Sequence, residues 1–144
     1  KELDIIAGYS EAPHYFSQIG FSLISRTNDN NELKFLLALL NSKLISFYHK
    51  NKFLDTEKIL FQKILIANCK KLPILRTENQ IYFIELIDSI LISKKENPQS
   101  NTTALERKID ELVFKLYDLT YSEVQVVCPD FWLSEEEYAA INIE

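Results

Sequence analysis

The residue types that support acid–base, metal or nucleophilic chemistry are few in this sequence. His14 and His49 lack partner residues at a suitable spacing, so exposed or hydrogen-bonded histidines are favoured over metal ligands or proton carriers. Cys69 and Cys128 stand far apart and outside any CxxC pattern, which argues against zinc and gives no disulfide framework. The acidic run at residues 135–137 is typical of a solvated helix start. These residues predict neither a catalytic residue nor a metal site.

Motifs for phosphate, cofactor or nucleophile chemistry are also missing. There is no G-x-G-x-x-G, G-x-x-x-x-G-K-[ST], H-E-x-x-H or G-x-S-x-G, and Gly8 and Gly20 are too few to build a phosphate-binding loop. No apolar run approaches the roughly 18 residues of a membrane span, so we expect a soluble, cytoplasmic chain. The sequence begins at Lys1 and contains no methionine, so we also expect a piece of a longer parent.

The charged residues are divided unequally along the chain. Residues 1–76 hold 11 Lys and Arg against 7 Asp and Glu, a net charge of +4, whereas residues 77–144 hold 5 against 14, a net charge of −9. A basic first part can meet a phosphate backbone, and an acidic second part is repelled from it and faces solvent or a protein. Ordinary surface charge is the alternative explanation for the +4.

The first part predicts short strands followed by a helix. Phe21–Ser25 alternates apolar and polar residues, which suits a half-buried strand. Asp29 and Glu32 then form a capping-box pattern at the start of a helix over residues 31–50. Its apolar stripe consists of Leu33, Leu37, Leu40, Leu44 and Phe47. A strand is predicted near Lys58–Ile64, then an irregular or helical turn up to Lys71, and Pro73 ends any regular element.

The acidic part predicts a helical hairpin and a short acidic helix at the end. Three capping-box pairs mark helix starts, namely Thr77 with Gln80, Thr103 with Glu106, and Thr120 with Glu123. The first two helices form an antiparallel αα-hairpin whose apolar stripes need a third element, and the helix from Leu33 to Phe47 is the candidate. Glu111 and Lys115 are predicted to pair on the outer surface of the hairpin's second helix.

These elements together predict an α+β fold that is mostly helical, with a few short N-terminal and central strands. We divide it into residues 1–76, with the strands and the helix over 31–50, and residues 77–144, with the hairpin and the acidic tail. Both parts are expected to form one structural unit.

Three stretches of sequence resemble the C-terminal specificity domain of TaqI-like and type IIG restriction-modification enzymes. They are "LLNSKL" at Leu39–Leu44, "LPI" at Leu72–Ile74 and "ALERKIDELVFKLYDLT" at Ala104–Thr120, within a resemblance over residues 20–127. Leu75 replaces a frequent second proline, and Asp118 stands where glycine is common, so Asp118 is expected to adopt a left-handed conformation after the helix.

The resemblance implies a module that recognises the sequence of double-stranded DNA for a larger enzyme. The parent would carry an adenine methyltransferase domain that uses S-adenosylmethionine and, in some members, a Mg²⁺-dependent endonuclease domain. Their motifs are absent from these residues, so no cofactor is expected here. The hairpin would then be a scaffold that holds the recognition part against the methyltransferase domain.

Such a module needs cations for phosphates and polar groups for base edges. The phosphate candidates are Lys43, Lys50, Lys52, Lys58, Lys63, Lys70, Lys71 and Arg76. Weaker candidates for base or sugar contact are Arg26, Tyr9, His14, His49, Asn51 and Gln62. For each of them, an exposed position without a partner is the alternative.

Two other functions fit the same sequence. One is a spacer in a specificity subunit like those of type I systems. The other is a helical protein-interaction module that does not bind DNA and uses its acidic hairpin to hold a partner.

Overall fold

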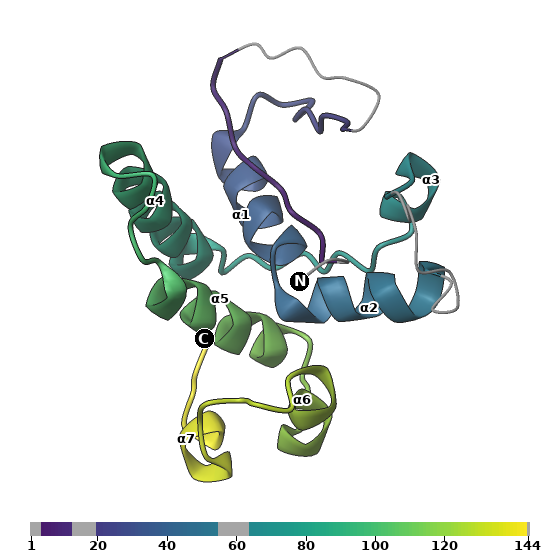
Figure 1. The fold of residues 1–144 in the computed structure, drawn as a ribbon, viewed down its shortest axis with the longest axis vertical. Coiled ribbons are helices and arrows are strands. Elements are labelled where there is room, and N and C mark those ends of the chain that lie inside the picture. Colours follow the sequence, from purple (N-terminus) through teal and green to yellow (C-terminus); the bar gives the residue numbers. More distant parts are fainter. Residues whose placement is uncertain (1–3, 13–19, 55–63, 144) are drawn as a thin grey trace.

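The computed structural model describes residues 4–12, 20–54 and 64–143, and all regular structure within these ranges is helical. The helices are α1 Asn30–Leu40, α2 Lys43–Phe53, α3 Ile66–Cys69, α4 Ile81–Glu96, α5 Thr103–Leu116, α6 Tyr121–Val127 and α7 Glu135–Ala139. Helices α1, α4 and α5 surround the centre of the molecule, and α6 and α7 lie on the far side of α5 (Figure 1). No helix of the described residues is long and apolar enough to cross a membrane.

The prediction of an α+β fold is wrong, because the described ranges contain no strand. Phe21–Ser25 has no regular structure and no neighbouring strand among the described residues, and Leu23 and Ile24 are exposed. An alternating pattern shows that a segment suits a sheet, but a strand also needs a partner for its backbone groups. The strand predicted near 58–64 falls mainly on residues outside the described ranges, and Ile64 itself has no regular structure.

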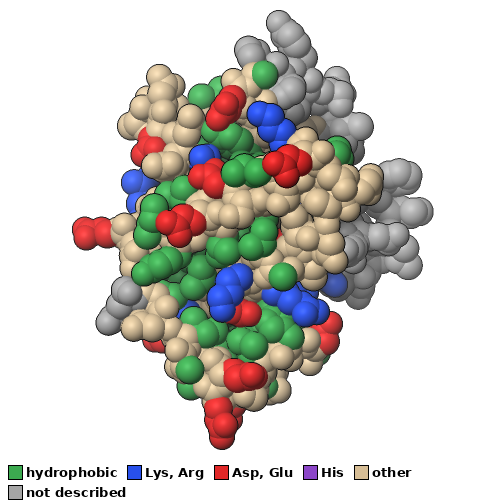
Figure 2. Space-filling view, turned by 90° about the vertical axis from the view of Figure 1, so that its left-hand side faces the viewer, with side chains coloured by type: hydrophobic (Ala, Val, Ile, Leu, Met, Phe, Trp, Pro, Cys, Tyr) green, Lys and Arg blue, Asp and Glu red, His purple; other side chains and the backbone are tan. Residues whose placement is uncertain are grey.

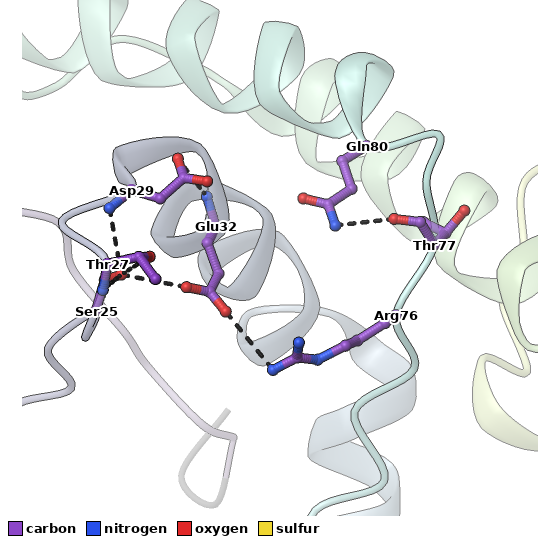
Figure 3. Close-up of polar contacts among 7 residues, drawn as sticks. All are labelled: Ser25, Thr27, Asp29, Glu32, Arg76, Thr77 and Gln80. Carbon is purple, nitrogen blue, oxygen red and sulfur yellow. Dashed lines mark hydrogen bonds and ion pairs between the residues drawn. The ribbon is translucent and has the colours of Figure 1, made fainter.

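Ser25 connects this segment to the start of α1 through hydrogen bonds of its hydroxyl. Its hydroxyl accepts the backbone N–H of Thr27 at 3.2 Å and of Asp29 at 3.3 Å, and it donates to Glu32 Oε2 at 3.2 Å. Asp29 caps α1 by accepting the N–H of Asn31 at 2.8 Å. Glu32 therefore does not close the predicted capping box, and its other oxygen faces Arg76 instead (Figure 3).

The helix predicted over 31–50 is two helices, α1 and α2, with a break at Asn41 and Ser42. Ser42 starts α2, because its hydroxyl accepts the N–H of Ile45 at 3.3 Å while donating to the carbonyl of Leu39 at 2.7 Å. Serine hydroxyls at such positions compete with the helical hydrogen-bond ladder. The apolar spacing continues across the break, so periodicity alone could not reveal it.

The core contains the three helices that the apolar stripes predicted. Phe35 of α1 packs edge-on against Phe83 of α4 with ring centroids 5.2 Å apart, and both rings are buried together with Ile87 of α4 and Val113 of α5. The sequence predicts that the hairpin packs against the helix from Leu33 to Phe47. This packing is confirmed for α1, the first half of the predicted helix. One core thus spans the predicted boundary after residue 76.

Three details of the predicted hairpin are wrong. The predicted capping box of Thr103 with Glu106 is absent, because the residue before α5 is Thr102, whose hydroxyl donates to Glu106 Oε1 at 2.6 Å instead of capping a backbone amide. Helix α4 begins at Ile81 instead of Thr77, because the Gln80 amide donates to the Thr77 carbonyl at 2.8 Å and leaves no capping box there (Figure 3). Glu111 is buried and accepts from Lys108 Nζ at 2.8 Å and from Trp132 Nε1 at 2.7 Å. It therefore does not form the predicted outer pair with Lys115. The capping box of Thr120 with Glu123 is confirmed at the start of α6.

Candidate nucleic-acid interface

Helix α2 presents a basic surface to solvent. It contains no acidic residue, and Lys43, Lys50 and Lys52 are all exposed. Ile45 is fully buried on the side of the helix away from Lys43, which fixes the helix to the rest of the molecule. Lys50 and Lys52 lie in the last turn, where positive charge is favoured by the helix dipole.

The segment Ile64–Arg76 extends this basic surface. Leu72 packs in the same apolar cluster as Ile45 of α2, so the segment and the helix lie side by side. Lys70 and Lys71 are exposed directly before Leu72. Arg76 is also exposed, and its guanidinium lies 3.7 Å from Glu32 Oε1, too far for a strong pair.

The two segments together, residues 43–54 and 64–76, carry six Lys and Arg and no Asp or Glu. Five of these six residues are lysines, namely Lys43, Lys50, Lys52, Lys70 and Lys71. None of the five forms an ion pair with another described residue. Unpaired cations on neighbouring segments are suited to phosphate groups, because they keep their charge available to a ligand. We call residues 43–54 and 64–76 the basic face.

Asp110 of α5 joins this basic face to the helical hairpin. Its Oδ1 accepts the backbone N–H of Lys43 at 2.8 Å, in the first turn of α2. The carboxyl group is buried, and burial raises its pKa to about 6 although the Lys43 amide opposes the shift. A carboxylate at this position satisfies one of the free amides of the helix start.

Asn41 fixes the other side of the same junction. Its side-chain amide donates to the carbonyls of Ala7 at 3.1 Å and Leu37 at 3.0 Å, and its oxygen accepts the N–H of Ala7 at 2.9 Å. Asn41 therefore binds the N-terminal segment to the α1–α2 break, and the N–H of Ile5 also donates to Ser46 Oγ of α2 at 3.1 Å.

Tyr117 of α5 holds the "LPI" stretch. Its hydroxyl donates to the carbonyl of Pro73 and accepts the N–H of Leu75 at 3.2 Å. Burial raises the pKa of Tyr117, so the phenol stays protonated and able to donate. Through Asp110 and Tyr117, one face of α5 contacts both segments of the basic face.

His49 occupies a position that the sequence did not predict. It is 1% exposed, and neither ring nitrogen has a hydrogen-bond partner among the described residues. Its ring lies beside Phe53, with centroids 5.8 Å apart. Burial lowers the pKa of His49, so the neutral ring is favoured. In this arrangement the ring is buried and is not presented at the surface.

The other predicted contact residues are dispersed. Arg26 is exposed before α1, Tyr9 lies partly buried against the main core, and Asn51 is exposed on α2 with its amide donating to the Phe47 carbonyl at 2.8 Å. The remaining predicted residues fall outside the described ranges: His14, Lys58, Gln62 and Lys63.

Sequence reasoning did not identify Asn41, Ser42, Asp110 and Tyr117 as the residues that hold the basic face. A signal was present, because each of them lies in a stretch that carries the resemblance. Their partners are distant in sequence, however, and a pattern in one sequence does not show which polar residues meet. Across the described residues, no group of three or more His, Cys, Asp or Glu could hold a metal ion.

Comparison with known proteins identifies one family. The model of the TaqI-like C-terminal specificity domain matches residues 1–74. No curated protein and no solved structure matches the chain. The matched range contains α1, α2, α3 and the "LLNSKL" and "LPI" stretches, whereas the stretch Ala104–Thr120 lies outside it.

Proposed function

Because this chain belongs to the TaqI-like C-terminal specificity domain family, we propose that it recognises the DNA sequence for a restriction-modification enzyme. The observation that carries this proposal is the family match over residues 1–74. That range includes every residue of the basic face except Leu75 and Arg76. The known family and the unpaired cations therefore point to the same part of the molecule.

The basic face is suited to the phosphate backbone of a duplex. Lysines of this kind fix the position of a protein on DNA and carry little sequence information themselves. Lys43 and Lys50 stand seven residues apart, two turns along one side of α2, about 10 Å from each other along the axis. Each strand of a duplex carries one phosphate per about 3.4 Å of its axis, so two lysines at this separation can contact different phosphates of one duplex.

Helices α4 to α7 serve as the scaffold in this proposal. They contribute Asp110 and Tyr117, which hold the two segments of the basic face at a fixed spacing. Residues 77–144 carry a net charge of −9 and would be repelled by phosphate, so this part faces away from the duplex.

The chemistry of the enzyme is assigned to domains outside these residues. We propose that the parent carries a DNA adenine methyltransferase domain that binds S-adenosylmethionine, and in some forms a Mg²⁺-dependent endonuclease domain. This chain would supply binding and positioning only, since it contains no nucleotide-binding or methyltransferase motif. Its partners would be double-stranded DNA and the methyltransferase domain.

A salt series with charge variants tests the proposal. Duplex DNA binding is measured by fluorescence anisotropy for the unmodified chain and for a Lys43→Ala, Lys50→Ala, Lys70→Ala, Lys71→Ala variant. Each lost phosphate contact should reduce the slope of log K against log salt by about one unit. The matched control is Lys94→Ala with Lys95→Ala at the end of α4, which should leave the slope unchanged. Equal slopes for the three proteins would exclude the basic face as the DNA-binding surface.

A protein-interaction module remains the second candidate function. The observation that favours it is the outer side of α4, where Ile81, Tyr82 and Ile92 are exposed. The two functions use different faces and can coexist in one module.

A further inference from the structure

Helix α4 is apolar on two sides. Phe83 and Ile87 are buried in the core. Ile81, Tyr82 and Ile92 project from the helix with exposed fractions of 52%, 45% and 59%. A helix that is apolar on most of its circumference normally has both sides covered. The second apolar side of α4 therefore indicates a missing partner.

The exposed residues of α4 form a continuous stripe. Tyr82, Glu85, Ser89 and Ile92 follow each other at spacings of three, four and three residues, and all four are exposed. This spacing places them on one side of the helix over three turns. Figure 2 looks at the α4 side of the molecule and shows apolar side chains gathered there, with acidic side chains between them.

The stripe borders a groove between α4, α5 and the C-terminal segment. The groove has a volume of about 590 Å³. Its apolar wall includes Tyr82 and Leu86 of α4, Leu112 of α5 and Ile141 beyond α7. A groove with an apolar wall, beside a stripe that has Tyr82 and Ile92 at its two ends, is suited to receive the apolar side of a helix.

The charges around the groove are negative. Glu85 and Glu137 line it, and Glu85 forms no ion pair with a described residue. Hydrogen bonds from Ser134 lower the pKa of Glu137, so this carboxyl group stays ionised. The lysine of the groove, Lys108, is already neutralised by Glu111 at 2.8 Å.

We propose that the outer stripe of α4 and this groove dock an amphipathic helix of a partner protein, with Lys and Arg beside its apolar stripe. The apolar residues would cover Tyr82 and Ile92, and the cations would pair with Glu85 and Glu137. Duplex DNA and a second copy of this chain fit less well, because phosphates or another acidic stripe would be repelled. This docking is independent of the proposed DNA recognition.

A titration followed by NMR tests the proposal on the isotope-labelled chain. The probe is a designed helical peptide of about 18 residues with leucines at one helical stripe and lysines elsewhere. One comparison peptide replaces the lysines by glutamates, and another has the same composition with the leucines scrambled. We expect amide shifts confined to α4, α5 and the residues from α7 to Ile141, and at least about tenfold weaker binding by both comparison peptides.

Variants of exposed residues separate docking from folding. Tyr82→Ala with Ile92→Ala should weaken binding of the lysine peptide about tenfold or more, and Glu85→Lys should weaken it severalfold. Ile24→Ala, at an exposed isoleucine outside both the groove and the basic face, is the matched control and should have no effect. All variants should keep their DNA affinity. The proposal is overturned if the lysine peptide does not bind, if shifts scatter over the molecule, if the three peptides bind equally, or if the stripe variants bind normally. Shifts of α4 amides that depend on the concentration of the free chain would show that a second copy of the chain, not a partner helix, covers the stripe, and would also overturn the proposal.

Discussion

Asp110 is the residue whose ionisation should control stability most clearly. Its pKa is raised to about 6 by burial, so between about pH 4 and pH 6 the folded chain binds more protons than the unfolded chain. Stability from this group is therefore greatest at low pH and is lost as pH rises through 6. A shift of this size corresponds to roughly 2–3 kcal/mol.

The variant Asp110→Asn isolates this effect. Asparagine keeps an oxygen that can accept the Lys43 amide but does not ionise. We expect the free energy of unfolding of the unmodified chain, relative to the variant, to fall by roughly 2 kcal/mol between pH 4 and pH 7. Urea denaturation at both pH values measures this difference. A difference that rises with pH would show that Asp110 is stabilised as a carboxylate.

His49 should act with the opposite sign. Its pKa is lowered by burial, so the unfolded chain gains protons first as pH falls below the ordinary histidine range, and stability falls with it. His49→Leu removes a buried imidazole without hydrogen-bond partners. We expect this variant to be more stable by about 1 kcal/mol at pH 7. Its advantage should increase at pH 5. Urea denaturation checks both points, and a less stable variant would contradict the burial of an unpaired ring.

Asp118 has the left-handed backbone that its position in the sequence predicted, with φ of 54°. The N–H of Leu119 donates to the Phe114 carbonyl at 3.0 Å and that of Asp118 to the Lys115 carbonyl at 2.9 Å, which forms a Schellman ending for α5. Asp118→Gly should therefore raise the free energy of unfolding by about 0.5 kcal/mol. Glu96→Gly, just inside the end of α4, should lower it. Destabilisation by Asp118→Gly would contradict the strained position.

At the scale of elements, α5 fixes the segment that follows α3. The Tyr117 hydroxyl is the link, since it bonds both Pro73 and Leu75. Tyr117→Phe should cost about 1 kcal/mol and should accelerate hydrogen exchange at the Leu75 amide, which loses its acceptor. Tyr121→Phe, which breaks a bond to the Leu133 carbonyl, should not change exchange at Leu75. Unchanged exchange in Tyr117→Phe would show that the segment is held by packing alone.

Local signals predicted some elements well. Thr120 with Glu123 marks the start of α6, because a capping box involves only four neighbouring residues. The break after Leu40 was missed, since the leucine spacing continues through Ser42. The outer position of Glu111 was wrong, because its partner Trp132 lies 21 residues away. Contacts of this range depend on the fold and leave little trace in local spacing.

The residue types of the candidate site could be predicted from the sequence, but the contacts that hold them in place could not. The family resemblance and the need of a DNA-recognition module for cations gave Lys43, Lys50, Lys70 and Lys71 as candidates, and these lysines lie on adjoining segments. The prediction could not include the residues that hold them, because the amide of Lys43 and its partner Asp110 are 67 residues apart.

In the whole molecule, basic and acidic residues lie on different parts of the surface. All of the basic face except Leu75 and Arg76 lies in residues that match the family, and the exposed stripe of α4 lies in the acidic residues 77–144. This division predicts that DNA and a basic helical partner bind simultaneously, since they occupy different faces. Adding the lysine peptide at saturation should change DNA affinity less than twofold after correction for its charge.

Mapping duplex DNA onto the chain by NMR tests directly whether the basic face binds DNA. The account predicts amide shifts on α2 and on residues 64–76, which decrease as salt is raised, and unchanged amides on the outer side of α4. Lys43→Ala with Lys70→Ala should weaken these shifts at equal DNA concentration. Shifts that centre on α4 to α7, or an absence of shifts at low salt, would contradict recognition through the basic face.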